Sequence, residues 1–124
     1  MGNLGKVIFC TLLVVTLLAF PLGAGNGIVL KIEWNNPFNP EASDSADRYT
    51  RVYYKVTEQG ATIRIYSING ELVRSDLVED KTETEDTIVW DGKNDKGEVV
   101  GNGVYLVNLK IDKSSKTVKV VVLK

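Results

Sequence analysis

The stretch IVWDGKNDKGEVVGNGVYL, residues 88–106, decides the fold of this chain, because it reads as a strand, a glycine-rich turn and a second strand. Ile88 and Trp90 are two positions apart, so they lie on the same face of the first strand. A tryptophan on an inward face is usually a core residue, since its large apolar ring gains much from burial. We therefore predict that Trp90 packs in the core of a β-sandwich.

The turn inside this stretch, residues 91–98, mixes Asp, Asn, Gly and Lys. Asp and Asn side chains in turns accept hydrogen bonds from nearby backbone N–H groups, and glycine adopts positive φ angles without steric cost. We predict that Asp91 and Asn94 bond to the backbone of the turn, and that Gly92 and Gly97 supply its unusual φ angles.

Alternation of apolar and polar residues with a period of two recurs along residues 25–124, whereas helical periodicity is almost absent. It predicts seven strands, at residues 28–34, 51–56, 61–67, 71–78, 87–91, 104–111 and 117–123. Trp34 falls on the apolar face of the first strand. Asn69 and Gly70 tolerate the positive φ angles of a type I′ turn, so they predict a hairpin between the third and fourth strands. The pattern as a whole predicts an all-β, immunoglobulin-like antiparallel β-sandwich, without the disulfide of antibody domains.

The first 24 residues carry one charge, Lys6, followed by an apolar run and small residues up to Ala24. This order is typical of a secretory signal peptide, and the run of about 14 apolar residues is shorter than the roughly 20 of a spanning helix. We predict cleavage after Ala24, with an uncleaved membrane anchor as the alternative. Residues 25–124 then form one exported domain. Without Lys6, 14 of the 15 basic residues remain against 16 acidic ones, a net charge of −2.

Residues 25–124 contain neither histidine nor cysteine, since the one cysteine is Cys10. Disulfides are therefore excluded, as are Ser-His-Asp, Cys-His and zinc-histidine sites. No two carboxylates stand out as a catalytic pair, so we predict a protein that is not an enzyme and has no cofactor. Lysines and carboxylates are interspersed without a basic stripe, which argues against a nucleic-acid partner.

Calcium binding stays open as an alternative. The turn at residues 91–98 lacks the spacing of an EF-hand loop, because Lys96 stands where that loop needs glycine. The acidic residues 79–86 read most simply as a solvated connection. Together the two segments nevertheless offer oxygen ligands for an irregular calcium site.

Trp34, Trp90 and Phe38 are candidates for an aromatic platform that binds sugars, but alternation places both tryptophans inward, which favours core packing. Phe38 lies between two prolines in a loop at residues 35–47. It is either a plug that pins this arm onto the sandwich or an exposed anchor, and we favour the plug. The last strand is apolar on both faces at residues 120–123, which predicts a central strand or an edge that another surface covers.

Five segments in order carry a family resemblance. They are Asn36-Pro37-Phe38-Asn39-Pro40, residues 51–56, the hairpin at residues 63–74, the block Val89-Trp90-Asp91-Gly92 with Gly97 and Gly103-Val104-Tyr105, and the basic, apolar ending at residues 116–124. Residues 35–124 thereby resemble the C-terminal sorting domain of type IX secretion cargo and the similar immunoglobulin-like domain of flagellar hook-capping proteins. The resemblance implies a non-enzymatic β-sandwich that other proteins at the cell surface recognise or bind.

We therefore expect an exported interaction module, in the periplasm, at the cell surface or outside the cell, that serves in sorting to or attachment at the bacterial envelope. Its partners would be proteins of the envelope or the secretion machinery, with a membrane only if the N-terminal segment is uncleaved. No cargo precedes the module, which favours a free-standing one. Candidate recognition residues are Phe38 and an outward basic side formed by Lys116, Lys119 and Lys124. The alternatives are a structural subunit that polymerises through strand edges and a calcium- or glycan-binding adhesin.

Overall fold

The computed structural model describes residues 27–81 and 84–124. The predicted signal peptide and its cleavage site after Ala24 lie outside the described residues. Within those two ranges no helix is long and apolar enough to cross a membrane. Their helical content is a single 3-10 turn, η1 (Ser45–Arg48).

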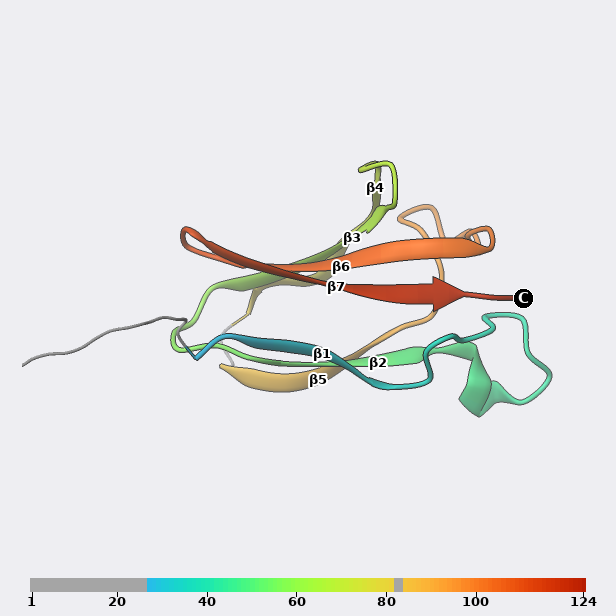
Figure 1. Ribbon diagram of the computed structural model, residues 1–124, viewed down its shortest axis with the longest axis horizontal. Helices are drawn as coiled ribbons and strands as arrows, with labels where there is room; N and C mark the ends of the chain where they lie inside the picture. Colours follow the sequence, from blue (N-terminus) through green and yellow to red (C-terminus); the bar gives the residue numbers. More distant parts are fainter. Residues whose placement is uncertain (1–26, 82–83) are drawn as a thin grey trace, which may run out of the picture.

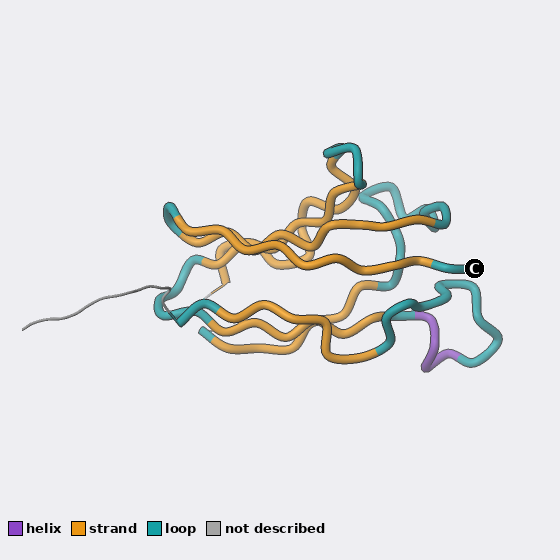
Figure 2. The backbone as a smooth tube through the Cα atoms, viewed as in Figure 1, coloured by secondary structure: helices purple, strands orange, loops and turns teal. Residues whose placement is uncertain are grey.

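Seven strands form two antiparallel sheets that pack face to face (Figure 1). The three-stranded sheet has the order β1 (Val29–Trp34), β2 (Thr50–Lys55), β5 (Glu85–Trp90). The four-stranded sheet has the order β4 (Leu72–Lys81), β3 (Ala61–Ser67), β6 (Gly103–Ile111), β7 (Ser114–Val122). Figure 2 shows the two layers, with connecting loops at both ends of the sandwich. The predicted immunoglobulin-like sandwich of about seven strands is confirmed.

The core lies between the two sheets and is built by the alternation seen in the sequence. Removing apolar surface from water, at about 25 cal/mol per Å², is the main stabilising term for such a core. Four strands each contribute two buried apolar residues: Val52 and Tyr54 on β2, Ile63 and Ile65 on β3, Val107 and Leu109 on β6, and Val120 and Val122 on β7. Alternation with a period of two therefore places one face of each of these four strands in the core.

Trp34 lies on the solvent side of β1, so the prediction that it faces the core is wrong. Its exposed fraction is 48%. The pairing of β1 with β2 shifts between Ile32 and Trp34, so β1 carries one extra residue there. Such a bulge reverses the alternation beyond it. Trp34 is paired with Arg51, whose guanidinium lies 5.4 Å from the centroid of the indole ring.

The β3–β4 hairpin forms where predicted, but its turn is not type I′. Gly70 has a φ of 88°, whereas Asn69 is not among the described non-glycine residues with positive φ. The Gly70 N–H donates to the Ser67 carbonyl at 2.9 Å, and the Ser67 N–H donates to the Glu71 carbonyl at 2.8 Å. This is the pattern of a turn followed by a left-handed glycine in a bulge, which needs one positive φ rather than two.

The acidic residues 79–86 are not simply a solvated connection, because β4 continues to Lys81 and β5 begins at Glu85. Glu85 is paired with Lys55 across the sheet, and the Lys55 Nζ lies 4.0 Å from its Oε1. The Tyr53 hydroxyl donates to the other oxygen of Glu85 at 2.7 Å. Cross-strand partners of this kind allow a carboxylate to occupy an exposed strand position.

Candidate interaction site

An aromatic cluster around Trp90 closes the end of the sandwich that carries the C terminus. Trp90, the last residue of β5, is fully buried. Its ring meets those of Phe38 and Tyr105 edge to face, with centroids 5.6 and 5.5 Å away. Its Nε1–H donates to the Lys93 carbonyl at 3.0 Å, so the polar atom of the indole keeps a partner inside the protein. The prediction that Trp90 is a core residue is confirmed.

Tyr105 fixes the start of β6 through its hydroxyl, which donates to the Gly101 carbonyl at 2.8 Å. A tyrosine at the start of the sixth strand that bonds to the backbone just upstream is the tyrosine corner of immunoglobulin-like sandwiches. Burial raises the pKa of Tyr105. Gly103 begins β6 opposite Val122. This bond was not predicted from the sequence, in which a tyrosine after a glycine-rich turn is the signal for it.

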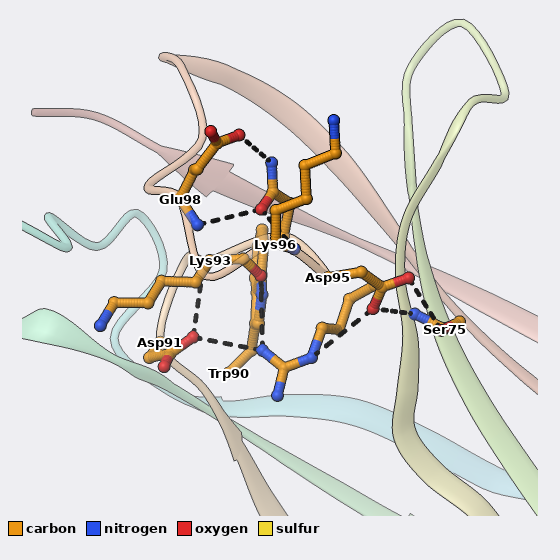
Figure 3. A network of polar contacts seen from close by, with 9 residues as sticks. Ser75, Trp90, Asp91, Lys93, Asp95, Lys96 and Glu98 are labelled. Carbon is orange, nitrogen blue, oxygen red and sulfur yellow. Dashed lines mark hydrogen bonds and ion pairs between the residues drawn. The ribbon is translucent and has the colours of Figure 1, made fainter.

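The turn at residues 91–98 is organised as predicted (Figure 3). Asp91 Oδ1 accepts from the backbone N–H two residues further on at 3.1 Å. Asn94 Oδ1 accepts from the backbone N–H groups two and four residues further on, at 2.9 and 3.0 Å. Gly92 and Gly97 have φ angles of 77° and 79°. The turn therefore holds its own shape through Asx-type bonds and two left-handed glycines.

Asp95 ties this turn to the free edge of β4, a contact that the sequence pattern does not predict. The Asp95 N–H donates to the Val73 carbonyl at 3.0 Å. The Asp95 carboxylate accepts from the N–H and the hydroxyl of Ser75, at 2.9 and 2.8 Å. These two bonds hold the pKa of Asp95 below its usual value. Because an open strand edge is a template for pairing with another chain, Asp95 closes part of an exposed edge.

Arg74 lies between two carboxylates of the turn, those of Asp91 and Asp95. Its guanidinium nitrogens are 3.5 Å from Asp91 and 4.0 Å from Asp95. Among the described side chains, no three His, Cys, Asp or Glu residues are placed to hold a metal ion. The alternative calcium site falls partly on side chains of residues 79–83, outside the described set.

The arm at residues 36–38 covers the outer edge of β7. The Phe38 N–H donates to the Val121 carbonyl, and the Leu123 N–H donates to the Phe38 carbonyl, both at 3.0 Å. The Asn36 side chain accepts from the Val121 N–H at 2.9 Å and donates to the Lys119 carbonyl at 3.3 Å. The doubly apolar end of β7 is therefore an edge that another segment covers, one of the two arrangements predicted.

Phe38 is a plug, because only 2% of it is exposed and its ring packs on Trp90. In this position it offers no surface to a partner. Gly92 makes room for the arm, since a Cβ on Gly92 would lie 2.7 Å from Pro40 Cγ and 3.3 Å from Phe38 Cε2. Gly92 therefore has two roles: it supplies a positive φ to the turn, and it leaves space for Phe38 and Pro40.

We expect Gly92→Ala to destabilise the fold by about 2 to 4 kcal/mol, because it combines an unfavourable positive φ with overpacking against Pro40. Gly97→Ala is the matched control, since its φ is nearly the same but nothing lies within 4 Å of the added Cβ. The control should cost about 1 to 2 kcal/mol, the price of the backbone strain alone. Denaturant melts compare the two, and equal losses would contradict the packing role of Gly92.

The three candidate recognition lysines do not form one outward basic side, so that expectation is wrong. Lys119 is paired with Leu106 on the outer face of the four-stranded sheet. Lys116 has the inward register, and its Nζ lies 3.5 Å from the Ile28 carbonyl across the sandwich. The Lys124 Nζ is 3.8 Å from a Glu41 carboxylate oxygen. Their role in recognition stays a prediction.

The aromatic platform is not assembled either. Trp34 is exposed on the outer face of the three-stranded sheet, whereas Trp90 and Phe38 are buried between the sheets. The three rings therefore do not share a surface on which a sugar could stack.

Comparison with known proteins agrees with this architecture. A model of the FlgD Ig-like domain family matches residues 41–122. No curated protein matches the chain. Among solved structures, the chain is similar to PorZ, an essential bacterial surface component of the type IX secretion system of Porphyromonas gingivalis, with a TM-score of 0.50 and 23% identity. That match covers 80% of this chain and 12% of PorZ, and at this identity it shows the fold alone.

Proposed function

The chain belongs to the FlgD Ig-like domain family, and from that membership we propose that it acts at the bacterial envelope as a protein–protein interaction module without enzymatic activity. The observation that carries the proposal is the family match over residues 41–122, which spans β2 to β7. The likeness to PorZ supports the shared architecture, and PorZ itself is a bacterial surface component. Sorting to the surface or attachment there is the role we propose for the module.

The closed edges of the four-stranded sheet support binding through faces and loops. Asn36 and Phe38 occupy the outer edge of β7, and Asp95 occupies part of the outer edge of β4. Edges closed in this way resist pairing with a second chain. They therefore weigh against polymerisation through these two edges.

The proposal is tested with photo-cross-linking side chains placed in the full chain in its source bacterium. Thr117 and Thr87 are exposed positions on the outer faces of the four-stranded and the three-stranded sheet, respectively. We expect a covalent adduct with an envelope protein from at least one of these faces. If neither position yields a protein adduct, the interaction role is refuted.

Export is a further part of the proposal, and it predicts that the mature protein begins at Gly25. The basis is the signal-peptide pattern with small residues at Gly23 and Ala24. The intact mass of protein recovered from the envelope or the medium tests this prediction, and a mass of residues 25–124 alone would support it. A mass that includes residues 1–24 would favour the anchored alternative.

We predict that charge reversal of the basic ending, by Lys116→Glu, Lys119→Glu and Lys124→Glu together, abolishes most surface attachment or partner capture. The variant should unfold within about 1 to 2 kcal/mol of wild type, because exposed ion pairs and surface substitutions contribute little to stability. Reversing three exposed loop lysines (Lys93, Lys96 and Lys113) is the charge-matched control. A folded variant that attaches like wild type would show that residues 116–124 are not the recognition element. The loop at residues 35–47 would then be the next candidate.

A further inference from the structure

The outward positions of β3, β6 and β7 differ in charge from the chain as a whole. The chain carries 16 acidic residues, yet the outward positions of β3, β6 and β7 hold no carboxylate. They hold three cations, Arg64, Lys110 and Lys119. Within the described part of the chain, none of the three takes part in an ion pair. We call these outward positions the β3-β6-β7 face.

A row of mostly apolar side chains crosses this face, beginning on the neighbouring strand β4. The cross-strand pairs Leu72–Tyr66, Tyr66–Leu106 and Leu106–Lys119 form one continuous row from β4 to β7. Leu72 is 51% exposed at the outer end of this row. A shallow, open depression of about 310 Å³ borders the row, lined by Tyr66, Gly70, Leu106, Asn108 and Thr117. That volume is at the lower limit of small-molecule pockets, which are roughly 300 to 1,000 Å³, so the open depression suits a side chain better than a whole ligand.

The outer face of the other sheet differs, because it carries carboxylates and its cations already have partners. Glu33 and Glu85 lie on its strands. Its cations are paired as follows: Lys31 over the Tyr53 ring at 5.1 Å, Arg51 over the Trp34 ring at 5.4 Å, and Lys55 with Glu85 at 4.0 Å. Among the described residues of the two outer faces, cations without an ion-pair or aromatic partner are therefore a feature of the β3-β6-β7 face.

We infer that the β3-β6-β7 face is the docking surface for the protein partner, and that the partner presents a peptide segment of alternating acidic and apolar residues. The inference rests on the proposed function and specifies its interface. Carboxylates of such a segment would neutralise Arg64, Lys110 and Lys119, while its apolar side chains would cover the row at Tyr66 and Leu106. A second copy of this chain is a poor occupant, because face-to-face docking would bring cations against cations.

The test uses a fluorescent octapeptide of alternating Glu and Leu, and the same peptide with Lys in place of Glu, titrated with the full chain in mild detergent. Anisotropy should report binding of the Glu peptide alone, weakening as salt rises. The variant Arg64→Gln, Lys110→Gln, Lys119→Gln should raise the Kd at least about tenfold. The matched control Lys93→Gln, Lys96→Gln, Lys113→Gln changes the net charge equally and should raise the Kd less than about twofold.

Several outcomes would overturn the inference: no binding of the Glu peptide, equal binding of both peptides, or equal weakening by the two triple variants. If the protein sediments with phosphatidylglycerol vesicles but does not bind the Glu peptide, the face binds a membrane surface instead. If the protein self-associates and the Arg64→Gln, Lys110→Gln, Lys119→Gln variant does not, the face binds a second copy of the chain. In the cell, a cross-link to protein from Thr87 but not from Thr117 would refute this inference and leave the proposed function standing, whereas no protein cross-link from either would refute both.

Discussion

Trp90→Ala is expected to lower the free energy of unfolding by roughly 3 to 5 kcal/mol, the cost typical of emptying a large aromatic site in a core. The indole is fully buried and meets two other rings edge to face. Its removal leaves a cavity between Phe38 and Tyr105 and takes away the nearer of two side-chain donors to the Lys93 carbonyl, the other being the Arg74 guanidinium at 3.4 Å. Both effects act in the same direction. Chemical denaturation followed by circular dichroism measures the loss.

Trp34→Ala is the matched control, because it removes the same side chain from a position that is 48% exposed. It forfeits the stacking with Arg51, an exposed cation–π contact of about 0.5 to 1 kcal/mol. We therefore expect a loss of less than about 1.5 kcal/mol. A Trp90→Ala variant that loses less than about 1 kcal/mol would show that Trp90 is not the core anchor assigned here.

The features that the sequence predicted depend on local patterns. Ile63 and Ile65 alternate with polar residues within one strand, and the Asx-type bonds of Asp91 and Asn94 reach only a few residues along the chain. Such signals are contained in the segment itself. This is why the strands, the Trp90 core position and the shape of the turn at residues 91–98 were predictable.

The features that the sequence did not predict depend on contacts between distant segments. The bulge that turns Trp34 outward is a register shift in the pairing of β1 with β2. The alternation of apolar and polar residues in β1 does not predict it. Gly92 reads as a turn glycine, although Pro40, far away in the chain, also requires it to lack a side chain. The strand order β3-β6-β7 likewise brings Arg64, Lys110 and Lys119 onto one face. In the sequence they are only three scattered cations.

Phe38→Ala is expected to destabilise the fold by roughly 3 to 5 kcal/mol, in the range for truncating a buried phenylalanine. Because the Phe38 backbone also pairs with Val121 and Leu123, loss of the plug should loosen the arm that covers β7. An uncovered apolar edge is an aggregation hazard, so the variant should associate as its concentration rises. Size-exclusion chromatography over a concentration series tests this second effect, and denaturant melts test the first.

Two further variants separate the ring from the arm. Phe38→Leu keeps apolar volume in the site and should cost less than the alanine change, without exposing the edge. Asn36→Ala keeps the ring and removes the side-chain bonds to Val121 and Lys119, so it should promote association with a smaller loss of stability. A double-mutant cycle between Phe38 and Trp90 should show a coupling of about 0.5 to 1.5 kcal/mol for their edge-to-face contact. If Phe38→Ala costs less than about 1 kcal/mol and the protein stays monomeric, the arm is not the element that closes β7.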